Sequence, residues 1–517
     1  MSKFNHSSVR ARGGVSAVSV DETPSGFTFE GGAGFARDEK SELFLAAVSD
    51  FANEGSFYES ANNRSRRINT LVRKVAVADP EWVKNFVTWL RNEANMRSIS
   101  LVIALEAAKG MLEANVPGAR AIVSSAIRRA DEPGEALGYW FANYGRKLPA
   151  PVKRGIADAV VKTYSQYSLA KYDTPSHSFR FGDVIELVHP SPKDVEQSNL
   201  FKYALDRRRN SDASAEGLDM LWNRALFMDM STDQKLEAIR SGNGSEILSN
   251  AGLTWEAVSG SAGKLDAKGW EALIPSMGYM ALLRNLRNFV AAGVSQKVLE
   301  TVLDRLSNEE QVAKSRQLPF RFLSAYRANS TNLKIGAALE DALGHSLANV
   351  PALKGKTLIL VDCSGSMYWS QSKNTDLSFA DTAAIFGTTL ALRAEKADLV
   401  MYGNRSEKIP FRKGDSVLPV LKRFHDMGGT STRKAVADNL NGHDRVILIT
   451  DEQATSGNVF SSVPKGVPTY TWNLVGYRYS SSPSGANRHF FGGLSDQSFK
   501  LIPLLERGID TGWPWEV

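Results

Sequence analysis

The chain has 517 residues, enough for two or three domains that each bury a core of their own. Its single cysteine, Cys363, excludes an internal disulfide and fits a reducing, cytoplasmic setting. No apolar run approaches the ~18 residues of a membrane span, and the N-terminal region lacks the apolar stretch of a secretory signal. The net charge of +6 is not concentrated in one part, since residues 351–517 hold 19 Lys and Arg against 16 Asp and Glu. A site for a polyanion must therefore come from local clusters.

The chain begins with a glycine-rich region and continues with a long helical one. Residues 1–38 show no long apolar periodicity and are predicted to be a flexible N-terminal segment. From residue 39 to 350, apolar residues recur at spacings of three and four, with Pro, Gly, Asn or Asp between the segments. The clearest helical segments are 41–52, 80–91, 98–114, 151–168, 276–292 and 295–306. About fifteen helices in succession without strand pairs are typical of helical pairs stacked as in HEAT repeats.

The pattern changes near residue 350, within a linker at 344–356 that contains glycine and proline. Strand-like apolar runs then alternate with helical stretches. The predicted strands are 357–361, 398–402, 445–450 and 469–475, and the predicted helices include 378–394 and 432–440. This alternation predicts a doubly wound, mostly parallel α/β sheet over residues 351–517.

Three loops of the predicted sheet carry oxygen-bearing side chains where strands end. The first strand runs into Asp362, Ser364 and Ser366, a second loop holds Thr430 after two glycines, and Asp451 directly follows the third predicted strand. The carboxyl ends of parallel strands meet at one sheet edge, so these oxygens can reach one hard cation, most suitably Mg²⁺. Alternatively, the two aspartates only cap loops or helices, or the site is retained with little metal bound.

The order and spacing of these five residues resemble the von Willebrand A domain and its metal-ion-dependent adhesion site, with its Asp-x-Ser-x-Ser pattern, distant Thr and distant Asp. The resemblance implies a cation that leaves one position open for a partner's carboxylate, which is a recognition device rather than a catalytic one. No general base stands beside the motif. His425 and His443 lie outside it and are expected on the surface.

Local basic clusters in the helical region are candidates for RNA binding, and the densest is 64–74 (RSRRINTLVRK). Basic side chains on a curved scaffold bind a phosphate backbone, while neighbouring aromatic side chains stack on unpaired bases. Taken alone, each cluster has the simpler explanation of a solvated helix face. The candidate RNA-binding residues are Lys171, Arg180, His189, Lys153, Arg154, Arg207, Arg208, Arg64, Arg66 and Arg67.

Residues 253–289 (LTWEAVSGSAGKLDAKGWEALIPSMGYMALLRNLRNF) resemble the TROVE domain of the Ro ribonucleoprotein autoantigens. The segments FGDVIELVHPSP, LFKYALDRRR, LPFRFLSAYRA and VDCSGSM fit the same family, and the resemblance spans about residues 30–517. It implies a closed ring of HEAT-like repeats over residues 39–350, whose two ends are joined by the von Willebrand A-like domain of residues 351–517.

The Ro resemblance also implies a function. The outer ring surface should bind a Y or Y-like small noncoding RNA, and the ring hole should take single-stranded 3′ ends of misfolded or immature RNA, in RNA quality control or maturation. His189 matches a family position that contacts Y RNA, Lys171 aligns in its Lys-Tyr context, and Arg180 follows from proximity alone. Residues 173–181 differ from the vertebrate proteins in length and character. Bacterial members imply an exoribonuclease as a further partner.

Two other functions are weighed against an RNA-binding protein without catalytic activity. The first is a metal-dependent interaction scaffold, in which the metal site binds an acidic protein ligand. The second is a metal-dependent nuclease. A single hydroxyl-rich cation site is a poor centre for two-metal hydrolysis, and no paired-carboxylate pattern occurs elsewhere, so catalysis is not expected.

Overall fold

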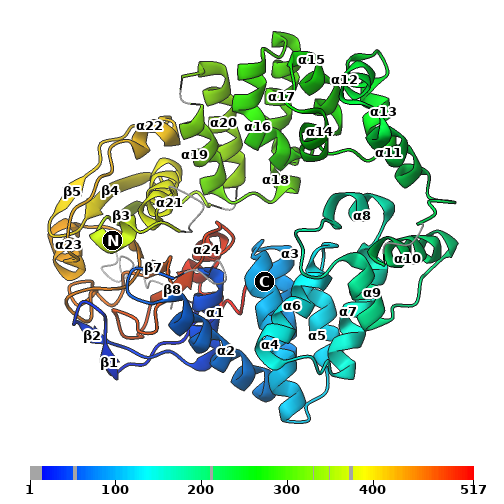
Figure 1. The fold of residues 1–517 in the computed structure, drawn as a ribbon. Coiled ribbons are helices and arrows are strands. Elements are labelled where there is room, and N and C mark those ends of the chain that lie inside the picture. The colour runs from blue at the N-terminus through cyan, green and yellow to red at the C-terminus, as the bar shows by residue number, and fades with distance from the viewer. Residues whose placement is uncertain are drawn as a thin grey trace.

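The structure is a computed structural model that describes residues 14–50, 55–209, 213–329, 331–348, 350–371 and 377–516. Figure 1 shows the elements arranged as a ring, with helices along most of the circumference and a sheet with its helices completing it at the left. The predicted fold class, a helical ring followed by an α/β domain, is confirmed. In the described part of the chain, no helix is both long and apolar enough to cross a membrane.

The first half of the ring consists of α1 (Glu39–Val48), α2 (Ala61–Ala78), α3 (Pro80–Asn92), α4 (Arg97–Glu113), α5 (Ala119–Ala126), α6 (Glu132–Tyr144), α7 (Ala150–Thr163), α8 (Gln166–Tyr172), α9 (Phe181–Val188), α10 (Val195–Arg208) and α11 (Asp219–Asp229). Each helix packs on near neighbours in the sequence, such as α2 on α4, α5 on α7 and α9 on α10. Together they bury one continuous hydrophobic core that reaches Leu221 in α11. Residues 51–52 of the predicted helix 41–52 lie outside the described residues.

The second half consists of α12 (Thr232–Arg240), α13 (Gly244–Asn250), α14 (Trp255–Ala262), α15 (Ala267–Leu273), η1 (Ile274–Ser276), α16 (Tyr279–Ala292), α17 (Gln296–Ser307), α18 (Glu309–Ser315), α19 (Pro319–Ala328) and α20 (Leu333–Ser346). A separate hydrophobic core begins at Phe227 and continues into the sheet. The helical region therefore rests on two cores that meet within α11. The structure describes twenty α-helices before the sheet, more than expected, because caps such as Thr254 and Asp266 start short helices.

The sheet contains β3 (Lys356–Asp362), β4 (Lys396–Tyr402), β5 (Ser406–Lys408), β6 (Arg445–Thr450), β7 (Thr469–Asn473) and β8 (Arg488–Gly492). Its order is β5-β4-β3-β6-β7-β8, and β5 alone among these strands is antiparallel to its neighbour. Further helices are η2 (Gly365–Tyr368), α21 (Phe379–Arg393), α22 (Val417–Leu421), α23 (Thr432–Asn439), η3 (Phe499–Leu501) and α24 (Ile502–Glu506). The four predicted strands are confirmed. The edge strands β5 and β8 escaped prediction because they are short and carry charged residues.

Residues 14–38 are packed against the C-terminal domain, so the prediction of a flexible segment was wrong for this part. Val18, Val20 and Phe35 are buried. Phe35 and Ser480 exchange backbone hydrogen bonds of 3.0 and 2.9 Å. A short hairpin, β1 (Gly26–Phe27) with β2 (Ala33–Gly34), lies between Val20 and Phe35 in the sequence. Residues 1–13 of the predicted segment lie outside the described residues.

A buried ion pair fixes the same segment. The guanidinium of Arg37 pairs with Glu452 and donates to the carbonyl oxygens of Tyr477 and Arg478, both at 3.1 Å. Both charged side chains are almost fully buried, so each depends on the other for compensation.

The end of the C-terminal domain returns to the first helices of the ring. The rings of Trp513 and Trp515 stack with centroids 5.6 Å apart. Both contact Phe44 of α1 and Trp82 of α3, at centroid distances from 5.1 to 6.3 Å. Aromatic packing therefore joins the two ends of the described chain and closes the ring.

Candidate functional site

The predicted oxygen ligands of β3 and β6 lie together at the carboxyl edge of the sheet. The two strands are parallel neighbours, so Asp362 at the end of β3 comes beside Asp451, which follows β6. The hydroxyl of Ser366 donates to Asp451 Oδ2 at 2.7 Å and lies 3.3 Å from the hydroxyl of Ser364. The backbone N–H of Ser364 donates to Asp362 Oδ1 at 2.9 Å. Direct contacts thus link four of the five predicted residues.

The fifth residue, Thr430, sits on a glycine loop that is fastened to the first loop. The N–H of Gly365 donates to the carbonyl of Gly428 at 2.8 Å. A Cβ on Gly429 would lie 2.7 Å from Asn404 Oδ1, which explains the glycine there. The carbonyl of Thr430 accepts from the hydroxyl of Thr455 at 3.1 Å, and its side chain is buried. Thr430 therefore lies between the loop of the serines and the loop that follows β6.

The two carboxylates of this edge are buried and carry no ion pair within the described residues. Asp362 Oδ2 accepts from the hydroxyls of Thr450, at 2.6 Å, and Tyr402, at 3.1 Å, two residues that the sequence motif did not identify. Burial raises the pKa of both aspartates. The Asp362 charge adds to the rise at Asp451, whose pKa reaches about 7.

This donor set fits a hard cation. Two buried carboxylates that lack a counter-charge, with hydroxyl oxygens beside them, are the groups that Mg²⁺ would stabilise. In the described ranges, no three His, Cys, Asp or Glu side chains converge as a ligand cluster. A cation at this edge would therefore rely on Asp362, Asp451 and the hydroxyls, with water completing its shell.

The two histidines near the motif differ in position. His425 is exposed, as predicted. His443 is buried at 4% exposure and its Nε2 lies 2.9 Å from Asp398 Oδ2, so the prediction of a surface residue was wrong. Burial lowers the pKa of His443. Asp398 belongs to the amino-terminal half of β4, so His443 lies at the opposite end of the sheet from the candidate metal site.

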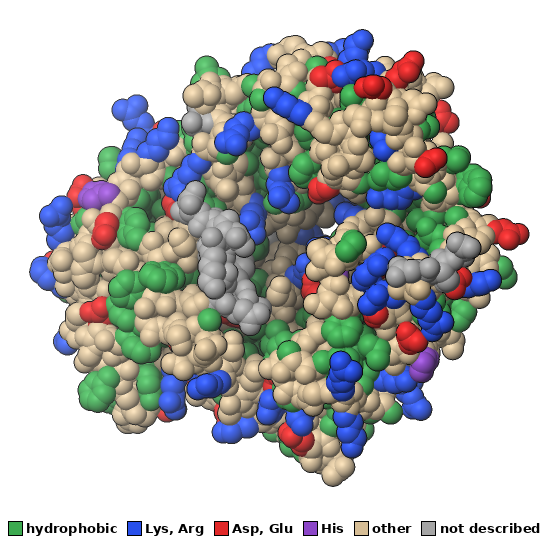
Figure 2. Space-filling view, viewed as in Figure 1, with side chains coloured by type: hydrophobic (Ala, Val, Ile, Leu, Met, Phe, Trp, Pro, Cys, Tyr) green, Lys and Arg blue, Asp and Glu red, His purple; other side chains and the backbone are tan. Residues whose placement is uncertain are grey.

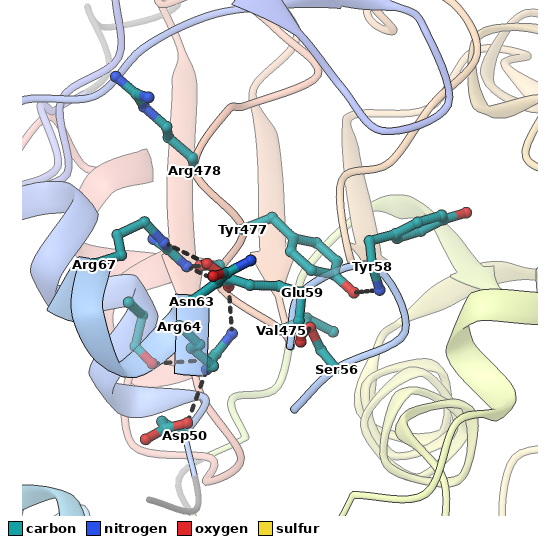
Figure 3. A network of polar contacts seen from close by, with 12 residues as sticks. Asp50, Ser56, Tyr58, Glu59, Asn63, Arg64, Arg67, Val475, Tyr477 and Arg478 are labelled. Carbon is teal, nitrogen blue, oxygen red and sulfur yellow. Dashed lines mark hydrogen bonds and ion pairs between the residues drawn. The ribbon is translucent and has the colours of Figure 1, made fainter. Parts of the chain in front are cut away.

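The basic cluster of α2 is divided between the protein interior and the surface. Figure 3 shows Arg64 and Arg67 turned towards acidic partners. Arg64 Nε donates to Asp50 Oδ1 at 2.8 Å, and Arg67 binds Glu59 through two hydrogen bonds of 2.9 Å. Arg67 also donates to the carbonyl of Gly476 at 2.9 Å, beyond β7. Arg67 therefore joins α2 to the C-terminal domain, Arg64 joins α2 to α1 and the residue Asp50 behind it, and Arg66 is exposed.

Candidates between α8 and α10 are also partly bound within the protein. Asp173 accepts from Arg180 at 2.7 Å and pairs with Arg207 at 3.4 Å, while Arg208 pairs with Asp183 at 2.8 Å. The guanidinium of Arg180 is mostly covered, whereas those of Arg207 and Arg208 remain accessible beside their partners.

Other candidates face solvent. His189 is exposed at the C-terminal end of α9, where its φ of 50° is left-handed. Lys171 is exposed, and its ammonium group lies 5.7 and 5.2 Å from the ring centroids of Tyr167 and Tyr172. On α7, Arg154 is exposed and Lys153 is half-buried. Lys171 and His189 are thus available for an RNA on this surface.

A further set of arginines, which the sequence analysis did not single out, lies in the middle of the ring. Arg97 and Arg129, from the first half, line a pocket of about 340 Å³ together with Arg316, which directly follows α18, and Arg321 of α19. In Figure 1, α18 faces α3 across the ring, and Figure 2 shows this face hollowed in the middle with basic side chains around the hollow. The pocket therefore lies at the ring opening, which we define by these four arginines.

The charges at the ring opening are only partly compensated. Arg97 and Arg129 both pair with Asp131, at 3.0 and 2.9 Å. Over the described residues, no ion pair forms at Arg316 or Arg321. Partial desolvation within the pocket lowers the pKa of Arg321, although its side chain still reaches solvent, and the neighbouring charge of Arg284 lowers it further. Arg284 and Arg321 stand in ALLRNL and LPFRF, segments that the sequence analysis used only to recognise the family.

Comparison with known proteins agrees with this architecture. Residues 227–355 match the TROVE domain, and this stretch begins where the second hydrophobic core begins. The chain is 23% identical over 335 residues to telomerase protein component 1 of Rattus norvegicus, covering 56% of this chain and 13% of that protein. It is 23% identical over 388 residues to RNA-binding protein RO60 of Caenorhabditis elegans, covering 62% of this chain and 59% of that protein.

The crystal structure of the Deinococcus radiodurans Ro protein has the same fold. It superposes with a TM-score of 0.63 at 18% sequence identity, covering 91% of this chain and all of that one. The fold defines a class of proteins in which a helical ring is closed by a parallel α/β domain. The chain thus matches the TROVE domain over residues 227–355 and shares its fold with a Ro protein. The chain spans less than two thirds of the length of the curated relatives that it matches.

Proposed function

We propose that the chain is an RNA-binding protein of the Ro type, which takes single-stranded 3′ ends of misfolded or immature noncoding RNA into the ring opening. The observation that carries this proposal is the group of arginines there, of which Arg316 and Arg321 have no ion pair in the described structure. Uncompensated guanidinium groups bind phosphates, and an opening between packed helices admits a single strand more readily than a duplex. The relatives named RNA-binding protein RO60 support the same reading.

The outer surface is proposed to bind a Y-like small noncoding RNA through α8 and α9. Lys171 supplies a charge beside two tyrosine rings, and His189 stands exposed at the end of a helix. An exposed lysine and an exposed histidine suit the phosphates of a structured RNA, and the tyrosines can stack on an unpaired base. This surface adjoins the ring opening, because the guanidinium of Arg129 lies 5.1 Å from the ring centroid of Tyr172.

The candidate metal site is proposed to hold Mg²⁺ through Asp362, Asp451 and the hydroxyls of Ser364, Ser366 and Thr430. Its role would be recognition, with an acidic protein ligand such as an exoribonuclease as partner, in the cytoplasm. The alternative, a scaffold that acts through this site alone, predicts that metal removal abolishes partner binding and leaves RNA binding unchanged. We propose no catalytic step.

Titration of the protein with two RNAs tests the main proposal. One RNA is a hairpin with a single-stranded 3′ tail, and the other is the same hairpin with a blunt end. We expect tighter binding of the tailed RNA, with an affinity that falls steeply as the salt concentration rises. Equal affinity for both RNAs would contradict binding in the ring opening, and cleavage of either RNA in Mg²⁺ would contradict the absence of catalysis.

A further inference from the structure

Helix α8 carries a track of alternating cations and aromatic rings that begins at the ring opening. The guanidinium of Arg129, one of the four arginines of the opening, lies 5.1 Å from the ring centroid of Tyr172. The ammonium group of Lys171 lies 5.2 Å from the same centroid and 5.7 Å from that of Tyr167. Tyr167 and Lys171 are one helical turn apart, so they share a face of α8. The track therefore leads from the opening to Tyr167.

The track ends at a pocket of about 370 Å³ where the two halves of the ring meet. In Figure 1, α8 and α11 of the first half lie there beside α13 and α14 of the second half. Tyr167 and Lys171 line the pocket from the first half, and Leu253, Trp255 and Met277 line it from the second half. A pocket of this volume between packed helices is typical of sites that bind small organic groups.

The lining of this pocket combines apolar, aromatic and polar groups. Its buried members are apolar, namely Leu248, Leu253 and Met277. Two aromatic side chains remain accessible, since Trp255 is half-buried and Tyr167 is 44% exposed. The hydroxyl-bearing Ser249 and the acidic Glu256 are exposed members of the lining. A flat aromatic group with polar edges fits this combination, because its faces can stack on the rings while its edge reaches the polar side chains.

The pocket has a fixed shape because its two sides are fastened together. Gln166 Oε1 accepts from the backbone N–H groups of Met220, at 3.1 Å, and Leu221, at 3.4 Å, and so ties α8 to α11. Arg224 of α11 donates to the carbonyl of Gly252 at 3.3 Å. A Cβ on Gly252 would lie 2.6 Å from Met220 Sδ, so only glycine lets this methionine pack there. A pocket that is already formed costs little ordering when a ligand enters.

We propose that this pocket binds one unpaired nucleobase of a bound RNA, while Lys171 binds the adjacent phosphate. This inference rests on the RNA binding proposed above. When a 3′ tail occupies the ring opening, the nucleotides on its 5′ side pass along α8, and one base enters the pocket to stack on Tyr167 and Trp255. A base held in a duplex cannot enter, so the pocket adds a second test for unpaired RNA.

The same pocket gives the chain a preference among bases. Stacking on aromatic rings accepts any base. The carboxylate of Glu256 only accepts hydrogen bonds, so it favours a base whose edge carries an amino group, such as adenine, over uracil. The occupant is therefore an unpaired, amino-bearing base next to the part of the tail that fills the opening.

Binding of tailed RNAs that each lack one base tests the proposal. Fluorescence anisotropy compares the intact 3′-tailed hairpin with versions that carry a single abasic nucleotide at successive tail positions. One position, on the 5′ side of the nucleotides in the opening, should weaken binding to the wild type about 10-fold. Tyr167→Ala should weaken binding of the intact RNA to a similar extent and should show no further loss at that position. Tyr167 is largely exposed, so this variant keeps the packing of α8.

Two further variants sharpen the test. Trp222→Ala is the matched control, because Trp222 is an exposed aromatic residue of α11 outside the pocket lining, and it should behave as the wild type does. Glu256→Gln should reduce the preference for adenine over uracil at the sensitive position and leave the effect of the abasic nucleotide in place. Equal binding of adenine and uracil there by the wild type would overturn the role of Glu256.

The outcomes separate this pocket from the ring opening. If Tyr167→Ala and the abasic nucleotide weaken binding additively at every position, base insertion is overturned, while tighter binding of tailed than of blunt RNA leaves the ring opening in place. Equal binding of tailed and blunt RNA, with no sensitive position, would overturn both proposals. Free adenosine monophosphate offers the same base and phosphate. If it occupies the pocket and tailed RNA does not displace it, RNA is overturned as the source of the base.

Discussion

Replacing Arg316 and Arg321 with glutamine removes two positive charges from the ring opening. Both side chains are exposed, and the described structure gives neither an ion-pair partner, so the substitution breaks no internal charge pair. Arg97 and Arg129 of the same pocket pair with Asp131 and are left unchanged. The double variant therefore tests phosphate binding in the opening with little effect on folding.

The expected loss follows from counterion release. Each phosphate contact on a single strand contributes about 0.7 to the slope of log Kobs against log salt concentration, so two lost contacts should lower the slope by about 1.4. At ~0.1 M salt, this corresponds to about 25-fold weaker binding, or about 2 kcal/mol. A tailed RNA should show the full loss, while a Y-like RNA without a free single-stranded end should show little.

Fluorescence anisotropy with a labelled 3′-tailed RNA, repeated over a series of KCl concentrations, measures the affinity and its salt slope. The matched control is Arg405→Gln with Arg412→Gln, which removes the same charge from exposed positions of the C-terminal domain. The control should keep the wild-type slope apart from a small general decrease in affinity. An unchanged slope in the ring-opening variant, or the same decrease in both variants, would refute phosphate binding at Arg316 and Arg321.

The remaining predictions concern the aromatic cluster around Trp513 and Trp515, the pH dependence of stability, and metal binding. Trp515→Ala should lower the free energy of unfolding by about 3 kcal/mol, because it removes a ring from an aromatic cluster. The control Trp222→Ala, at a side chain that is 57% exposed, should change the free energy of unfolding little. Thermal unfolding of the two variants measures the difference. Burial lowers the pKa of His489 to about 4 from 6.5. The unfolded chain therefore binds a proton at a higher pH than the folded chain does. The free energy of unfolding falls by up to about 3 kcal/mol as the pH drops from 6.5 to about 4. His489→Phe should therefore lose less stability than the wild type between neutral and acidic pH, and parallel melting curves for the two would contradict this. Mg²⁺ should raise the melting temperature of the wild type but not that of Asp362→Ala, and the two proteins should bind RNA with equal affinity. A wild-type RNA affinity that changes when EDTA is added would show that the metal site and the ring opening are coupled.

The sheet and its edge were predictable because their signals are local. An apolar strand that ends in Asp362, and another that ends before Asp451, determine both the strands and the place where their side chains meet. The N-terminal segment was read as flexible because glycine usually marks a loop. At Gly32 the missing side chain instead permits close packing against a loop that is distant in sequence, which no local pattern reveals.

The basic residues illustrate the limit of sequence reasoning at the ring opening. A cluster such as that of α2 has the same composition whether its charges face solvent or acids. Arg67 is bound by Glu59 and by the carbonyl of Gly476, a partner that only the closed ring brings near. In the same way, Arg97 and Arg321 meet because the two halves of the ring face each other. Charge density was therefore a weaker guide than the path of the chain through space.

The aromatic cluster that Trp513 and Trp515 form with Phe44 and Trp82 has a consequence for folding during synthesis. Phe44 and Trp82 emerge early from the ribosome, whereas Trp513 and Trp515 emerge among the last described residues. The helices between them can fold as they appear because their packing is mostly between near neighbours. The early aromatic surface stays uncovered by these two tryptophans until residues 513–515 have been synthesised.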